Sequence, residues 1–222
     1  MIAELIDKQD NSEIVRDQIA AILATEVANQ QALAIADGKD PADYKLRIYT
    51  ERSNPWEAFL NDQTDRSPIV NVWFDSSNFD KGASNIVERQ KTEATFNIDC
   101  IGFGMSEDVP GGGHKAGDKE AALEVQRAIR LVRNILMAAE YTYLGMQGVV
   151  WQRWPQSITS FQPQIDGRQI QQIVGARLAF NVVFNEFSPQ VPAVTLELVS
   201  AEVSRSEDGE VIVNADYDYT TP

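Results

Sequence analysis

Residues 90–104, QKTEATFNIDCIGFG, constrain the fold more than any other stretch, because they alternate in character along the chain. Apolar or small residues occupy one parity and polar residues the other: Ala94, Phe96, Ile98 and Cys100 against Lys91, Glu93, Thr95, Asn97 and Asp99. A β-strand sends successive side chains to opposite faces, so the pattern predicts a long strand with one face on a core and one toward water or a partner. Ile101 and Phe103 reverse the pattern, which predicts a bulge or a second apolar surface at that end.

A second stretch, residues 169–187, alternates in the same way and matches the first in length and polarity. We therefore expect the two strands to pair as antiparallel neighbours, with a helix packed across one face. Shorter strands are predicted at residues 44–50, 69–74 and 149–154, the last of them stopped by Pro155.

Two long helices are predicted where apolar residues recur near the helical period. The first covers residues 12–37: Asp10 and Glu13 have the spacing of a capping box, and Gly38 stands where a left-handed residue ends a helix. The second covers about residues 118–144. Because only one stripe of each helix is apolar, each must lie on another element, and the sheet is the obvious one.

The predicted fold class is α+β: a mostly antiparallel, twisted β-sheet flanked by two long helices, with a C-terminal β-hairpin extension. The polar runs at residues 75–85 and 105–117 are expected to be loops, the second long and flexible. The division into domains is residues 1–188 for the main body and residues 189–222 for a hairpin arm with a flexible end.

The hairpin is predicted from residues 194–204 and 210–214, which flank a turn signal at residues 206–209 (SEDG). Residues 216–222 are expected to be disordered. An isolated hairpin is marginal by itself, so this one either adds to the main sheet or lies on another subunit. We expect it to serve assembly rather than folding.

The 222 residues carry 19 Lys and Arg against 33 Asp and Glu, a formal charge of −14. Such a surface repels phosphate and disfavours a nucleic-acid binder, but it does not exclude a surface past which DNA slides without sticking. No run approaches eighteen apolar residues and no basic segment precedes an apolar one, so neither a membrane span nor a signal peptide is expected.

No catalytic, cofactor-binding or metal site is predicted. The glycine-rich run at residues 111–115, GGGHK, lacks the Gly-Lys-Ser/Thr order of a phosphate-binding loop. His114 is the single histidine, and Cys100, on the apolar parity of its strand, is expected to be buried and distant from it. The chain is therefore not expected to be an enzyme.

Three arginines recur at three-residue spacing in the second helix: Arg127, Arg130 and Arg133. They form either a solvated helix face or a subunit contact that pairs with acids on a neighbour. His114 and Lys115, in the predicted loop before that helix, are further candidates for a contact with a subunit or a partner.

The order of elements and three stretches resemble the tail terminator family of tailed bacteriophages, also described as tail completion or minor tail protein U-like. The stretches are RQKTEATFNIDCIGFG (residues 89–104), DKEAALEVQRAIRLVRNILM (118–137) and GARLAFNVVFNEF (175–187). In looser form the resemblance covers about residues 12–188, and residues 194–222 depart from the smaller members.

The resemblance implies a virion structural protein, assembled in the bacterial host cytoplasm, that forms a ring, usually hexameric, at the head-proximal end of the tail. It implies that the ring ends tail-tube polymerisation and joins the tail to the head connector, with tube, connector and sheath proteins as partners. DNA would pass through its lumen without specific binding. Alternatives are a head-closure, neck or tube-related protein and, in another class, a small-ligand-binding or enzymatic α+β domain.

Overall fold

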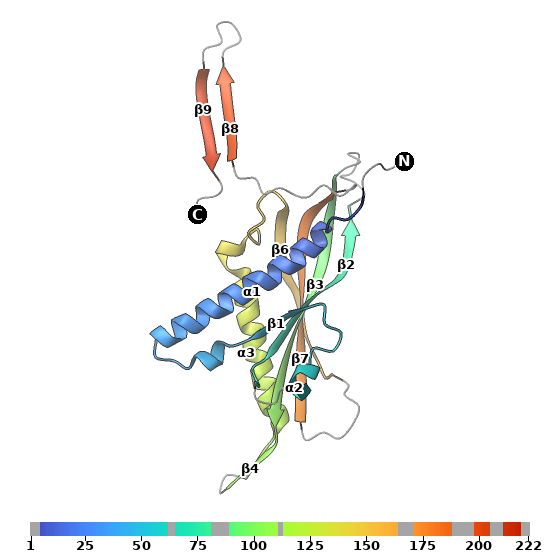
Figure 1. Cartoon of the computed structure of the whole chain (residues 1–222), viewed down its shortest axis with the longest axis vertical. Helices are drawn as coiled ribbons and strands as arrows, with labels where there is room; N and C mark the ends of the chain where they lie inside the picture. The colour runs from blue at the N-terminus through green and yellow to red at the C-terminus, as the bar shows by residue number, and fades with distance from the viewer. Residues whose placement is uncertain are drawn as a thin grey trace.

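The chain folds around a five-stranded sheet with strand order β1-β2-β3-β7-β6, and the two long helices α1 and α3 lie beside it (Figure 1). The computed structural model describes residues 5–61, 65–80, 89–110, 113–163, 171–187, 198–204 and 211–218. The strands of the main sheet are β1 (Arg47–Thr50), β2 (Ile69–Phe79), β3 (Arg89–Met105), β6 (Val150–Phe161) and β7 (Gln171–Phe187). In this sheet only β1 and β2 pair in parallel, so the predicted α+β fold with a mostly antiparallel sheet is confirmed.

The centre of the sheet is the antiparallel pair of β3 and β7, each 17 residues long. Their register runs without a break from Arg89 opposite Phe187 to Met105 opposite Gln171. The predicted pairing of the two alternating stretches is therefore confirmed. One parity of β3 is fully buried, as its apolar residues indicated: Ala94, Phe96, Ile98 and Cys100.

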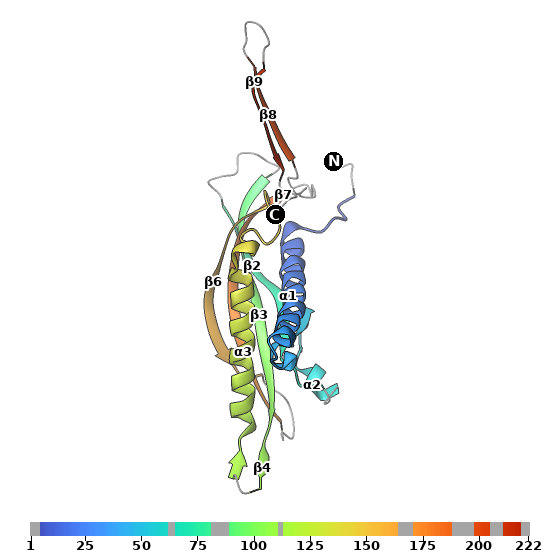
Figure 2. The ribbon, with the colours of Figure 1, turned by 90° about the vertical axis from the view of Figure 1, so that its left-hand side faces the viewer.

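Helices α1 (Asn11–Ala36) and α3 (Gly117–Met137) lie side by side on one face of the sheet, as Figures 1 and 2 show. Their buried residues join those of β3 and β7 in one cluster, which includes Ile19, Leu23, Val125, Val132, Phe96, Leu178 and Phe180. Burying side chains of this size stabilises the fold by about 1.5–3 kcal/mol each. The core therefore lies between the helices and this face of the sheet.

Helix α3 approaches β3 closely because glycines stand at the contact. A Cβ atom on Gly104 would lie 2.0 Å from the carbonyl oxygen of Gly117, and one on Gly102 would lie 2.5 Å from that of Ala121. Helix α3 ends at Met137, earlier than predicted, because Ala138 is extended with ψ 145°. A short 3₁₀ turn, η2 (Ala139–Tyr141), follows.

The opposite face of the sheet carries a smaller apolar cluster beneath α2 (Glu57–Asn61), formed by Phe59, Ile69, Ile101, Phe103 and Ile173. This cluster explains why Ile101 and Phe103 reverse the alternation of β3, so a second apolar surface is present as predicted. The face predicted to point toward water or a partner includes Asn97 and Asp99, which are only 5% and 7% exposed. The Asp99 carboxylate is covered by the longer side chains of Trp73 and Arg177, which donate hydrogen bonds to it.

Two expectations about strand ends and one about a loop are corrected. Strand β2 continues to Phe79 through an irregularity after Phe74, since β3 offers it a partner along that length. Strand β6 continues past Pro155 to Phe161, because an edge strand tolerates a residue without an N–H. The expected loop at residues 105–117 contains two paired strands, β4 (Glu107–Val109) and β5 (Gly113–Lys115). Residues 81–88 and 111–112 of the expected loops lie outside the described residues.

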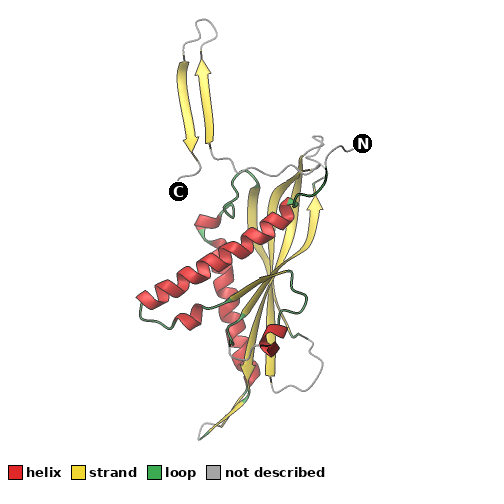
Figure 3. Cartoon of the chain, viewed as in Figure 1, coloured by secondary structure: helices red, strands yellow, loops and turns green. Residues whose placement is uncertain are grey.

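The C-terminal strands β8 (Leu198–Ser204) and β9 (Val211–Asp218) form a two-stranded sheet of their own. Figure 3 shows this hairpin away from the five-stranded sheet, so it does not add to that sheet within one chain. The expectation of disorder from Asp216 is corrected, since β9 includes Asp216 to Asp218. The predicted turn at residues 206–209 and residues 219–222 lie outside the described residues.

One described helix, α1, is long and apolar enough to cross a membrane by those two criteria alone. This is weak evidence, since a core helix near the start of a chain passes the same test. The expectation that no segment spans a membrane is not decided by this finding and stays a prediction. In this structure the buried stripe of α1, which includes Val15, Ile19 and Leu23, lies on the sheet.

Candidate assembly surfaces

The side of α3 that faces away from the sheet is basic and partly apolar. Its residues recur at helical spacing and are all exposed, and we call them the outer stripe of α3: Lys119, Leu123, Gln126, Arg130, Arg133 and Met137. Leu123 is 56% exposed and Met137 is 40% exposed. Around Arg130 and Arg133 the exposed residues of α3 include no acid, although the whole chain has a formal charge of −14, whereas Glu120 and Glu124 border Lys119 and Leu123 nearer the start of the helix. A local charge opposite to that of the whole chain marks this surface as a candidate contact.

Arg127 does not belong to the outer stripe. Its Nη1 atom donates to Asp43 Oδ1 at 2.6 Å, and its Nη2 atom donates to Glu124. Asp43 lies in η1 (Pro41–Tyr44), so Arg127 ties α3 to the segment that follows α1. Its side chain is only 25% exposed, and its charge is balanced within the subunit. The three arginines therefore do not share one role, because Arg127 forms ion pairs within its own subunit.

Arg130 and Arg133 are exposed, and within the described part of the chain neither forms an ion pair. Arg130 also borders a depression of about 470 Å³ between α3 and η1, together with Tyr44 and Asn134. Their charges are available to acids on another molecule, which keeps both of the predicted possibilities open: a solvated face or a subunit contact.

His114 and Lys115 lie in β5, at the far end of α3. His114 Nδ1 lies 2.8 Å from Asp108 Oδ1, and the two exposed side chains face each other across the β4–β5 pair. Lys115 is opposite Glu107 in the register. Because an α-helix rises 1.5 Å per residue, Arg130 lies roughly 20 Å from the start of α3. The structure therefore does not bring His114 and Lys115 together with the exposed arginines.

A cluster that sequence reasoning missed lies on the face of the sheet opposite the long helices. Arg177 Nε and Nη2 donate to the two carboxylate oxygens of Asp99, at 2.7 and 3.0 Å, and Trp73 Nε1 donates to the same group at 3.0 Å. The guanidinium lies 4.7 Å from the centre of the Trp73 ring and 5.6 Å from that of Phe161. This Asp99–Arg177 cluster borders a depression of about 390 Å³.

This cluster combines charged and aromatic side chains. Hydrogen bonding to Asp99 raises the pKa of Arg177 above its ordinary value. Arg52 and Trp56 line the same depression, and arginine with tryptophan is the composition that protein contacts favour. The sequence held one signal: Asp99 and Arg177 are charged residues on the polar parity of the two long alternating strands. Their pairing depends on the register, in which they stand directly opposite.

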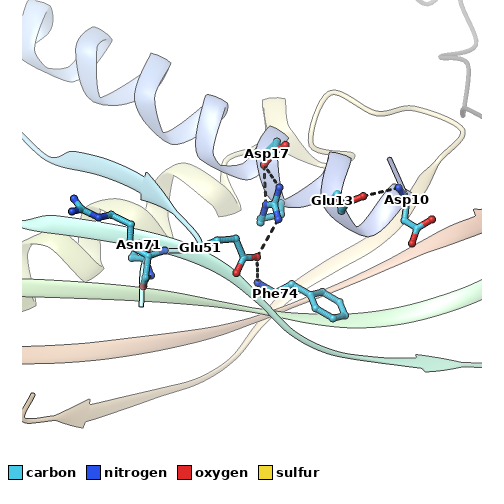
Figure 4. Close-up of polar contacts among 8 residues, drawn as sticks. Asp10, Glu13, Asp17, Glu51, Asn71 and Phe74 are labelled. Carbon is cyan, nitrogen blue, oxygen red and sulfur yellow. Dashed lines mark hydrogen bonds and ion pairs between the residues drawn. The ribbon is translucent and has the colours of Figure 1, made fainter. Parts of the chain in front are cut away.

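The N-terminal part of α1 is held to the sheet by charged groups. Glu13 Oε2 accepts the N–H of Asp10 at 2.9 Å, which forms part of the predicted capping box, and Figure 4 shows this contact. Glu51 Oε1 accepts from Arg16 at 3.1 Å and from the N–H of Phe74 at 3.0 Å (Figure 4). These bonds connect α1 to the strand edge where β1 ends.

Glu186, near the end of β7, accepts the N–H groups of Asn11 and Ser12 at 3.0 and 3.3 Å. The first N–H groups of a helix have no partner within the helix, so this carboxylate satisfies two of them. Burial outweighs these bonds and raises the pKa of Glu186 above its usual value. Glu186 thus joins β7 to α1 through a carboxyl group whose ionisation is disfavoured by burial.

The C-terminal half of α1 exposes an uncharged surface. Small and apolar residues occupy its solvent side: Ala21, Ala24, Ala28, Ala32, Leu33, Ile35 and Ala36. Glu26 is the one charged residue of α1 between Asp17 and its end, and it accepts the hydroxyl of Tyr141 at 2.6 Å. This hydrogen bond is the largest cause that raises the pKa of Tyr141 to about 12. Contact cores are depleted of charge, so this is a second candidate surface.

Among the described residues, no group of three or more His, Cys, Asp and Glu side chains could hold a metal ion. Cys100 is fully buried in the core, and burial raises the pKa of its thiol. What this part of the chain presents to other molecules is a set of surfaces: the outer stripe of α3, the uncharged side of α1 and the Asp99–Arg177 cluster.

No protein-family model matches the chain, and the comparison with curated proteins found no match either.

Proposed function

We propose that this chain is a structural protein of a phage virion. In this proposal its copies form a ring, hexameric as in the family it resembles, at the head-proximal end of the tail. The ring ends the polymerisation of the tail tube and joins the tail to the head connector, while DNA passes through the lumen. Tube, connector and sheath proteins are its partners, and it is assembled in the host cytoplasm.

The observation that carries the proposal is the arrangement of the three stretches on which the resemblance rests. Residues 89–104 and 175–187 lie side by side in β3 and β7, and residues 118–137 form α3 across one face of them. The charge distribution adds support, since a channel wall that carries negative charge does not retain DNA.

The test is electron microscopy of the purified full chain mixed with tail tubes isolated from the same source. A tail-terminating ring binds at one end of the tube and stops its growth. A head-closure or neck protein, the runner-up, binds the connector and leaves bare tubes alone. A tube-related protein adds along the length and makes the tubes longer.

A second candidate function is favoured by the depression beside the Asp99–Arg177 cluster. An α+β domain that binds a small anion could use Arg52 and Arg177, which line that depression. Thermal melts in the presence of small carboxylates and phosphates address this alternative. A rise in melting temperature that is lost in Arg52→Ala would favour ligand binding over a purely structural role.

A further inference from the structure

We propose that the acidic C-terminal hairpin of one copy docks on the outer stripe of α3 of a second copy, where Arg130 and Arg133 receive its carboxylates. This inference rests on the proposed function, because it names the contact that joins neighbouring subunits of the ring.

The hairpin is a separate two-stranded unit. In the part of the chain that the structure describes, strands β8 and β9 pair with each other and with no strand of the main sheet. Figures 1 and 2 show them standing away from both long helices. A two-stranded hairpin is marginally stable in water by itself, so contact with another surface stabilises it.

The hairpin region and the outer stripe carry opposite charge. Residues 189–222 contain seven carboxylates against one arginine, a net charge of −6. The carboxylates are Glu197, Glu202, Glu207, Asp208, Glu210, Asp216 and Asp218. The outer stripe contributes three positive charges from Lys119, Arg130 and Arg133. Complementary charge of this kind steers association and fixes its register.

The spacing of the charges fits. Arg130 and Arg133 are three residues apart on a helix, which places their Cβ atoms about 5–6 Å apart. Asp216 and Asp218 are two residues apart in β9, so their Cα atoms are roughly 7 Å apart. Long arginine side chains easily cover this difference. Exposed Leu123 and Met137, which lie before and after the two arginines in the stripe, add apolar area to the contact.

A second copy is the occupant that this chain favours. Arg127 is neutralised within its own subunit by Asp43 and Glu124, whereas among the described residues no acid forms an ion pair with Arg130 or Arg133. Ten residues of chain separate Phe187 from Leu198, which can span at most about 35 Å and so reach a neighbour. Each copy then contributes its hairpin to one neighbour and its outer stripe of α3 to the other. Such head-to-tail contacts generate rings when the rotation between subunits closes.

The test compares two charge-reversed chains, alone and mixed. The first carries Arg130→Glu and Arg133→Glu, and the second carries Asp216→Lys and Asp218→Lys. Each alone brings like charges together and should raise the dissociation constant for self-association by about tenfold or more. In an equal mixture, every hairpin meets an oppositely charged stripe, so assembly should return. A Lys39→Glu, Arg66→Glu chain is the control for the first chain, because it has the same charge change at exposed sites elsewhere.

Mass photometry of the full-length chains gives the oligomeric state, and circular dichroism shows that each variant is folded. If a reversed chain is unfolded, Arg130→Ala, Arg133→Ala and Asp216→Asn, Asp218→Asn replace it, with weakened assembly as the expected result. The inference is overturned if the reversed chains assemble like the control, if the mixture fails to recover, or if the wild-type chain stays monomeric. Arginine-dependent binding of a DNA duplex by the stripe, with assembly unchanged, would assign this surface to nucleic acid instead.

The two proposals fail separately. Rings that form and bind tube ends in every variant remove the hairpin contact and leave the proposed function standing. Rings that depend on the contact but do not bind tube ends support the hairpin contact and contradict the proposed function.

Discussion

Asp99 of β3 accepts two hydrogen bonds from Arg177 of β7, the residue directly opposite it in the sheet. The Asp99 side chain is 9% exposed, whereas that of Arg177 is 38% exposed. The buried carboxylate of Asp99 is thus held by Arg177, whose side chain remains partly exposed to solvent. This arrangement leads to the first of five predictions.

Asp99→Ala should lower the free energy of unfolding by about 2 kcal/mol, because hydrogen bonds to charged groups contribute roughly 1.5–3 kcal/mol. It also leaves Trp73 Nε1 without its acceptor. Urea denaturation measures the loss. Thr159→Ala, at an exposed position opposite Arg177 in β6, is the control and should change stability little. Equal stability of the two variants would contradict this account of the cluster.

Phe96→Asp should unfold the domain or leave it molten. The substitution removes about 1.5–3 kcal/mol of apolar burial and places an unpaired charge where the side chain is fully buried. The control is Lys91→Asp, at an exposed position of the same strand. Thermal melts that place both variants at the same temperature would show that the facing of β3 is wrong.

Gly104→Ala should separate the start of α3 from β3. The added Cβ would lie 2.0 Å from a backbone carbonyl oxygen, which cannot move aside as a flexible side chain could. Gly38→Ala is the comparison: its site is open but has φ +66°, a strain of about 1–2 kcal/mol. Hydrogen exchange should speed up along the first turns of α3 in Gly104→Ala alone. Unchanged protection there would contradict the close approach.

Glu186→Gln should alter the dependence of stability on pH. The raised pKa of Glu186 means that the folded state holds the proton more tightly than the unfolded chain does. Its contribution to the free energy of unfolding therefore falls as the pH rises above 4.5 and through the raised pKa. Glutamine retains an acceptor for the N–H groups of Asn11 and Ser12 and does not ionise.

Stability curves at a series of pH values check this sign. The advantage of Glu186→Gln over the wild-type chain should grow with pH and then level off. Glu57→Gln, at an exposed position in α2, should show no such growth. An advantage that shrinks with rising pH would mean that the bonds to α1, and not burial, control the carboxyl group.

The sequence predicted the central elements because alternation and helical period are local properties. The pairing of β3 with β7 and the core residues on one parity followed directly from them. The extension of β6 past Pro155 did not, since it depends on β6 being an edge strand. The strands β4 and β5 were missed because, among the described strands, they pair with each other alone and flank a glycine-rich run.

The candidate surfaces were harder to predict, because they depend on distant parts of the chain. Arg127, Arg130 and Arg133 look equivalent in the sequence, and only the position of Asp43 in η1 makes the first of them an internal tie. Asp99 and Arg177 are 78 residues apart, and a shift of one residue in the register would separate them. Periodicity indicates which face a residue is on, but it does not identify its partner.

The central claim is that this chain forms a closed ring that caps a tail tube, and the mass of the purified full-length protein tests it most directly. A hexamer of the 24.7 kDa chain has a mass of about 148 kDa. Mass photometry should show this closed species, and the same sample should be seen at one end of tail tubes by electron microscopy. A monomer at every concentration, or a closed ring that never binds a tube end, would contradict the account.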